Sequence, residues 1–208
     1  MKKFLFVAWL LLPLMVCAIS AVWAGGLDDL KAGESSLLMA SFDALLLKKG
    51  DYDKAIALFT KAIESGDLSR EDLGRAYLSR GVAWDSKGDY DKAITDHTKA
   101  IELNPKDAYA YSNRGNAWSE KGDYDKAIAD YSKAIEINQK YASAYKSRGS
   151  AWANKGDYNK AIADFTKAIE INPKNAYAYY YRGAAWDKKG DHAKAKADYD
   201  KAKELGYK

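Results

Sequence analysis

The chain has 208 residues, of which 48% are hydrophobic and 30% are charged, so it can bury a substantial core and does not have the composition of a disordered chain. Lysine and arginine number 33 against 29 aspartate and glutamate residues, which gives a net charge of +4. So small an excess of positive charge gives no electrostatic reason to expect nucleic acid as a partner, and we expect none.

Residues 1–24 have the three parts of a cleavable signal peptide. Lys2 and Lys3 precede an apolar run over residues 4–19, and small residues lie before the expected cleavage after Ala24. We therefore expect an exported protein, either periplasmic or secreted, which meets the membrane only transiently through this segment. The single cysteine would leave with the signal peptide, so the mature protein is expected to fold without disulfides.

Two alternatives to cleavage stay open at this end of the chain. The apolar run approaches the roughly 20 residues that span a bilayer, so it could remain as a membrane anchor. Cys17 could carry a lipid, although Val16 replaces the small residue expected before such a cysteine.

A glycine-centred pattern recurs along the rest of the chain. Gly-Asp-Tyr or a close variant begins at five glycines, spaced 38, 34, 34 and 34 residues apart: Gly50, Gly88, Gly122, Gly156 and Gly190. Recurrence at a fixed period is the sequence signature of stacked structural units. The sequence therefore contains five copies of one unit.

Each unit has the pattern of two helices. In the third unit, Tyr111, Gly115 and Trp118 recur at i, i+4 and i+7, and Gly122 can take the left-handed conformation that ends a helix. From Tyr124 onward, apolar residues recur at i, i+3, i+4, i+7, i+10 and i+11, again on one helical face. The unit is therefore predicted to be a helical hairpin, and we expect Asp107 and Asn175 to cap the first helices of the units that they precede.

These positions resemble the signature of the tetratricopeptide repeat family, with small Gly115 in the first helix, Ala127, Tyr131 and Ala134 in the second, and Pro105 before the next unit. The resemblance implies an all-α fold, a right-handed superhelix of five helical hairpins and ten helices. The tryptophan at each first helix is then a packing residue. The expected order is a linker over 25–35, a degenerate repeat over 36–69, and repeats over 74–107, 108–141, 142–175 and 176–208.

Differences between the copies carry further predictions. The last four units share an arginine on the first helix and an aspartate on the second. We expect each arginine to form an ion pair with the aspartate of its own unit, because an unpaired charge near the interface would cost desolvation energy. The expected pairs join Arg80, Arg114, Arg148 and Arg182 to Asp96, Asp130, Asp164 and Asp198, respectively. Lys196 and Lys203 replace isoleucines in the last unit, where no further unit would cover an apolar face. The first helix of the first unit is apolar nearly all round and needs cover from Leu27 and Leu30 or from a partner chain.

The sequence gives little support for chemistry. His97 and His192 stand in columns that are otherwise aromatic, and neither has a second histidine or a cysteine at ligand spacing. We therefore expect no catalytic residues, no metal and no cofactor.

The resemblance also implies a concave groove lined by the first helices, where members of the family hold an extended peptide or a partner helix. Tyrosine and asparagine on these helices suit peptide recognition. The predicted partner-binding residues are Tyr109, Asn113, Asn116, Lys146, Tyr177, Tyr180 and Tyr181. We expect a non-enzymatic adaptor or scaffold that binds a protein or peptide segment. The alternative is a structural or oligomerising subunit that associates through the apolar first helix.

Overall fold

The computed structural model of the chain describes residues 52–207, and the secondary structure within that range is entirely helical. The helices, in order, are α3 (Tyr52–Ser65), α4 (Arg70–Lys87), α5 (Tyr90–Leu103), α6 (Ala108–Glu120), α7 (Tyr124–Ile137), α8 (Ala142–Asn154), α9 (Tyr158–Ile171), α10 (Ala176–Lys188) and α11 (His192–Glu204). The predictions for the signal segment, the linker, the apolar first helix, and its cover by Leu27, Leu30 or a partner chain lie outside the described residues.

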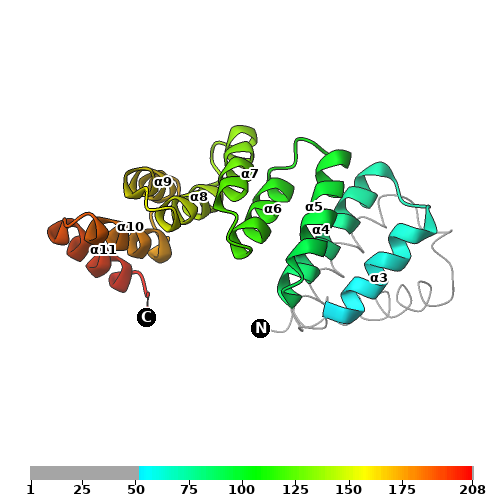
Figure 1. Cartoon of the computed structure of the whole chain (residues 1–208), viewed down its shortest axis with the longest axis horizontal. Helices are drawn as coiled ribbons and strands as arrows, with labels where there is room; N and C mark the ends of the chain where they lie inside the picture. Colours follow the sequence, from blue (N-terminus) through cyan, green and yellow to red (C-terminus); the bar gives the residue numbers. More distant parts are fainter. Residues whose placement is uncertain (1–51, 208) are drawn as a thin grey trace, which may run out of the picture.

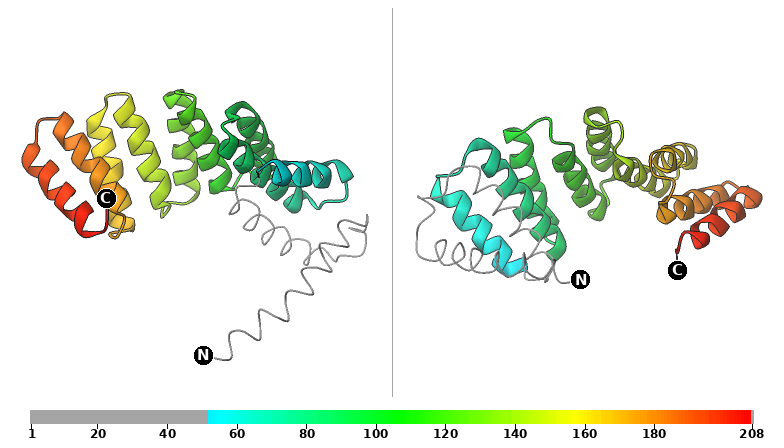
Figure 2. Two further views of the ribbon diagram at one scale, coloured as in Figure 1. Left: turned by 90° about the horizontal axis from the view of Figure 1, so that it is seen from below. Right: turned by 180° about the vertical axis from the view of Figure 1, so that it is seen from behind.

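The helices form consecutive antiparallel hairpins that stack into a right-handed superhelix, as predicted (Figure 1). The hairpins α4–α5, α6–α7, α8–α9 and α10–α11 follow one another from the cyan end to the red end, and both views in Figure 2 show the same order. Neighbouring first helices approach one another in the pairs α4 and α6, α6 and α8, and α8 and α10, whereas no two second helices in this range come into contact. The stack is therefore tighter on the side of the first helices, which makes that side the concave one.

Side chains and glycines fix where each helix begins and ends. Asp123 precedes α7 and accepts a hydrogen bond from the backbone N–H of Lys126, and an aspartate does the same before α5, α9 and α11. Gly122 follows α6 with a φ of 79°, which a residue with a side chain rarely adopts. Asp107 and Asn175 cap α6 and α10, as predicted. The start of α8 differs, because Tyr141 stands at the cap position and makes no side-chain capping bond.

Close packing of glycine against an aromatic ring joins the two helices of each of the last four repeats. A Cβ atom added at Gly115 would lie 2.8 Å from Cε1 of Tyr131. Ile135 of α7 then packs with Ala144 of the next first helix, so each second helix supports the hairpin that follows. Each tryptophan packs against the core as predicted: Trp84, Trp118, Trp152 and Trp186.

Residues 70–73, which lie between the predicted first and second repeats, are helical. They add a turn to the start of α4, which begins at Arg70, before the predicted repeat start at residue 74. Ser69 caps this turn by accepting a hydrogen bond from the N–H of Asp72, and its hydroxyl donates to the Asp72 carboxylate at 2.7 Å. Nε of Arg70 donates to the carbonyl of Leu103 at 3.1 Å, which ties the extra turn to the end of α5.

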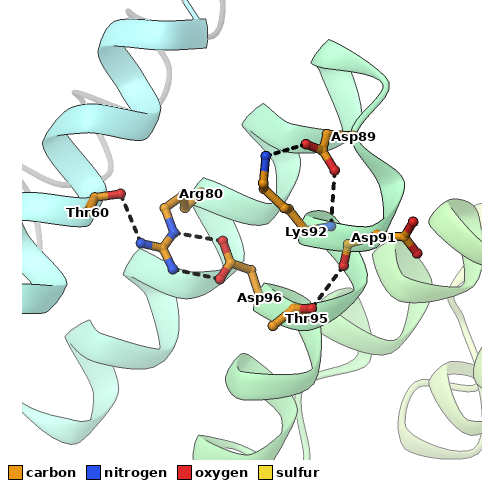
Figure 3. A network of polar contacts seen from close by, with 7 residues as sticks. All are labelled: Thr60, Arg80, Asp89, Asp91, Lys92, Thr95 and Asp96. Atoms are coloured by element: carbon orange, nitrogen blue, oxygen red, sulfur yellow. Dashed lines mark hydrogen bonds and ion pairs between the residues drawn. The ribbon is translucent and has the colours of Figure 1, made fainter.

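The predicted arginine–aspartate pairs are present in all four repeats, and Figure 3 shows the first of them, Arg80 with Asp96. Nε and Nη2 of Arg80 each donate to one carboxylate oxygen of Asp96 at 2.8 Å. Nη1 of Arg80 donates to the hydroxyl of Thr60 at 2.9 Å, and this third contact was not predicted. It recurs in the later repeats, where the acceptors are Thr98, Ser132 and Thr166. Each arginine therefore joins its own second helix to that of the preceding repeat.

The C-terminal repeat ends on a polar surface, as predicted. Lys196 and Lys203 are exposed, and Lys196 donates to Asp200 at 2.6 Å. Asp200 occupies the position that carries Thr98, Ser132 or Thr166 in earlier repeats. Charge thus replaces both the isoleucines and the hydroxyl that would otherwise contact a following repeat.

Candidate functional site

The predicted partner-binding residues lie on one side of the first helices. On α8, Gly149 packs against Phe165 of α9 and Arg148 binds Asp164 of α9, so this side of α8 faces the second helix. At about 100° per residue, Ser143 and Asn154 turn to the opposite side, and Lys146 lies at its edge, about 160° from Arg148 and about 60° from Gly149. We call the side of α4, α6, α8 and α10 that faces away from the second helices the groove face.

Three tyrosines stand out on the groove face. Among the described residues, the large hydrophobic side chains that remain exposed are Tyr109 at 61%, Tyr177 at 58% and Tyr181 at 39%. All three were predicted as partner-binding residues. Tyr109 and Tyr177 lie at the starts of α6 and α10, and Tyr181 lies in the middle of α10. Their rings offer apolar area together with a hydroxyl group.

Neighbouring rings hold these tyrosines in place. Tyr109 meets Tyr141 edge-on with ring centroids 5.1 Å apart, and Tyr177 meets Tyr207 in the same way at 5.3 Å. Tyr181 stacks on Phe165 of the preceding repeat at 6.0 Å. An aromatic surface that is already ordered loses little side-chain entropy when a partner binds.

Tyr180 is less accessible than its neighbours. Its ring stacks on Tyr207 with centroids 4.1 Å apart and an interplanar angle of 17°, and it also contacts Tyr199 at 5.5 Å. The three predicted tyrosines of α10 therefore differ in exposure: Tyr177 and Tyr181 face solvent, whereas Tyr180 is partly covered by Tyr207.

The polar residues predicted for the site lie between the two groups of tyrosines. Asn116 is exposed, and its Oδ1 accepts a hydrogen bond from the hydroxyl of Tyr131 at 2.8 Å. This bond leaves the amide nitrogen of Asn116 without a partner within residues 52–207. Asn113 and Lys146 are half-buried, and their side chains make no hydrogen bond or ion pair in the described part of the chain. The centre of the groove face thus has unused donors.

Sequence reasoning missed Tyr141 and Tyr207. Tyr141 lies at the start of the fourth repeat, and Tyr207 follows Gly206, whose φ is 91°. Tyr207 contacts Tyr177 much as Tyr141 contacts Tyr109, so it takes the place of the first residue of a following repeat. Burial raises the pKa of the Tyr141 phenol above its ordinary value.

The two histidines replace aromatic residues, as predicted, and they do so in different surroundings. His97 is fully buried beneath Gly81, and its Nε2 lies 2.9 Å from the carboxylate of Asp85. His192 is exposed at the start of α11, where Nδ1 lies 2.9 Å from Asp187.

Within residues 52–207, no group of three or more histidine, cysteine, aspartate or glutamate side chains is placed to hold a metal ion. None of the helices in that range is both long enough and apolar enough to cross a membrane.

Comparison with known families identifies the repeat. Models described as tetratricopeptide repeat match residues 45–100, 108–141, 142–175 and 165–197, and a model described as TPR repeat matches residues 86–119. No curated protein matches the sequence significantly.

Solved structures share the fold. A crystal structure of MamA is 29% identical, covers 78% of this chain and 93% of its own, and superposes with a TM-score of 0.69. BtubC from P. vanneervenii is 20% identical, with coverages of 92% and 89% and a TM-score of 0.78. YrrB, described as a TPR protein with an unusual peptide-binding site, is 24% identical, with coverages of 81% and 85% and a TM-score of 0.63. With the family matches across residues 45–197, the repeated helical hairpins establish that this chain belongs to the tetratricopeptide repeat family.

Proposed function

We propose that the protein is a non-enzymatic adaptor or scaffold that holds an extended segment of another protein against the groove face of α6, α8 and α10. One observation carries this proposal: the exposed large hydrophobic side chains of the described residues, Tyr109, Tyr177 and Tyr181, all lie on this face. Exposed tyrosines gathered on one concave side favour an interaction surface over a merely solvated one.

The chemistry of the face suits a peptide. The tyrosine rings offer large contact areas, and their ring contacts already restrict them. Asn113 and Asn116 add amide groups, which can pair with the N–H and C=O of an extended backbone. The likeness to YrrB supports only the fold at 24% identity, so the case for a peptide rests on these side chains.

We also propose that the protein is exported, on the strength of the signal-like sequence of residues 1–24. Fusion of alkaline phosphatase after the last residue should give active enzyme outside the cytoplasm and a mature N-terminus at Gly25. An intact N-terminus would contradict cleavage, and inactive phosphatase would contradict export.

Site-specific photo-crosslinking tests the groove. A photoreactive phenylalanine at Tyr109 or Tyr177 should give a crosslinked species in intact cells, and mass spectrometry should identify the same partner segment at both positions. Ala129 and Ala163, which are exposed on the second helices, provide matched controls. Equal crosslinking at the control positions, or crosslinking only there, would contradict a partner in the groove.

A further inference from the structure

We infer that the segment held in the groove is acidic, and that its side-chain carboxylates bind Lys140, Lys146 and Lys174. This inference rests on the proposed function and specifies the chemistry of the partner.

At the edge where first helices turn into second helices, the lysines of the described residues are paired except for Lys188. Lys121 binds Asp91 of the preceding repeat, while Lys126 binds Asp123 of its own turn at 2.7 Å. The same arrangement recurs at other turns, in the pairs Lys87–Asp53, Lys155–Asp125, Lys92–Asp89, Lys160–Asp157 and Lys194–Asp191. A lysine with its own carboxylate has little free charge to offer a partner, so this edge is an unlikely anchor for an anion.

The opposite edge, where second helices turn into first helices, is different. Lys140 and Lys174 are exposed one residue before the cap positions of α8 and α10, and neither side chain forms a hydrogen bond or ion pair within residues 52–207. Their neighbours along the chain are the uncharged Tyr141 and Asn175. Lys106 precedes α6 in the same way, but Asp107 follows it and offsets its charge.

Lys146 adds a third unmatched charge at the edge of the groove face. It is half-buried, whereas the other lysines of the described range that lack a partner are exposed. Helix α8 has no acidic residue, and the acidic residues of α6 and α10, Glu120 and Asp187, lie near the far ends of those helices. The cations at the start of α8 and α10 therefore have no carboxylate beside them on their own first helix, and Asp107, next to Tyr141, already accepts the N–H groups of Tyr109 and Ala110. Most other lysines within residues 52–207 are paired.

An acidic protein segment complements this arrangement. Lys140 and Lys174 occupy equivalent positions of adjacent repeats, which packed helices place roughly 10 Å apart. An extended chain advances about 3.3 Å per residue and alternates its side chains between two faces, so acidic side chains two or four residues apart, roughly 7 or 13 Å, bracket that spacing on one face. Tyr109 and Tyr177 lie on the repeats to either side of α8, where they can contact apolar side chains of the same segment.

The probe is an array of 12-residue peptides of random sequence, acetylated at the N-terminus and amidated at the C-terminus, so that every carboxylate comes from a side chain. The full chain should select peptides enriched in aspartate and glutamate. The variant Lys140→Gln/Lys146→Gln/Lys174→Gln should lower their affinity about tenfold or more, since charge-assisted hydrogen bonds are lost. High salt should also weaken the selected peptides.

A matched control removes the same charge elsewhere. Lys61 and Lys203 are exposed on second helices and have no side-chain partner within residues 52–207, and Lys167 of α9 is exposed and pairs only with Glu170 of its own helix. Replacing all three with glutamine should change affinity by less than about twofold, because screened distant charges contribute little. Circular dichroism must show that both triple variants are folded.

The outcomes separate the inference from the proposed function. Selection of peptides without acidic enrichment, or equal losses of peptide affinity in the two triple variants, would overturn the inference that the bound segment is acidic. If Tyr109→Ala and Tyr177→Ala still weakened peptide binding, the proposed peptide groove would stand. Displacement of acidic peptides by an oligonucleotide at equal charge concentration would indicate a general polyanion site and would overturn the inference. Failure of the wild-type chain to bind any peptide would overturn both.

Discussion

The contact between Gly115 and Tyr131 allows a sharp test of how the repeats pack. An alanine Cβ at position 115 would lie 2.8 Å from Cε1 of Tyr131, well inside the 3.5–4.0 Å at which carbon atoms pack comfortably. The ring is 2% exposed and its hydroxyl is bonded to Asn116, so it has little room to retreat. Overpacking of this kind costs about 3 kcal/mol at the upper end, and alanine regains about 1 kcal/mol of helix propensity. We expect Gly115→Ala to lower stability by about 2 kcal/mol.

Gly74 provides the matched control, because an added Cβ there would meet Leu103 at an ordinary 3.5 Å. Gly74→Ala should therefore raise stability by about 1 kcal/mol, the propensity gain alone. Thermal unfolding followed by circular dichroism at 222 nm should show a fall of about 4–8 °C for the first variant and a rise of about 2–4 °C for the second. If Gly115→Ala raised the melting temperature, the close approach would not limit this core. In a Tyr131→Leu background, Gly115→Ala should no longer destabilise.

Three further predictions follow from other contacts. Arg114→Met and Asp130→Leu should each lower the free energy of unfolding by about 3 kcal/mol, because each leaves one member of the pair without its partner. The double variant should lose much less than the sum of the two, and additive losses in urea unfolding would exclude the pairing. Burial, assisted by the hydrogen bond and charge of Asp187, raises the pKa of Tyr199 from 10.0 to about 12. The stabilisation from this phenol is therefore present below pH 10 and lost as the pH rises toward 12, and Tyr199→Phe should lose less stability over this range. An absorbance titration in which no tyrosine ionises late would contradict the shift. Lys196→Ile with Lys203→Ile should cause concentration-dependent association in analytical ultracentrifugation, whereas a monomer at all concentrations would show that these lysines are not needed to end the stack.

The repeated features of the fold could be predicted because each one recurs in a fixed column. A glycine opposite an aromatic ring, as at Gly115 and Tyr131, leaves the same spacing in several repeats, and so does an arginine such as Arg114 sixteen residues before Asp130. The hydroxyl that completes the network was harder to find. Thr98 also has a column of its own, but serine and threonine are common on helix surfaces, and only the fold shows that it faces the next repeat's arginine.

Features that occur once or twice were less predictable. The extra turn of α4 had a readable signal, since Ser69 and Asp72 have the spacing of a capping box, but the repeat period favoured a linker there. Tyr207 lies outside any helical stripe, and its contact with Tyr180 depends on the turn at Gly206. Of the candidate site, the sequence could predict which residues share the groove face; it could not predict which tyrosines other rings cover, because those rings belong to other repeats or to the chain end.

The central claim is that a partner segment lies against the first helices. Hydrogen exchange of the full chain, with and without the segment identified by crosslinking at Tyr177, tests it most directly. Bound segment should slow exchange in the first turns of α6, α8 and α10 and leave the outer faces of α5, α7 and α9 unchanged. Protection confined to those second helices, or no protection at a saturating concentration of the segment, would contradict the account.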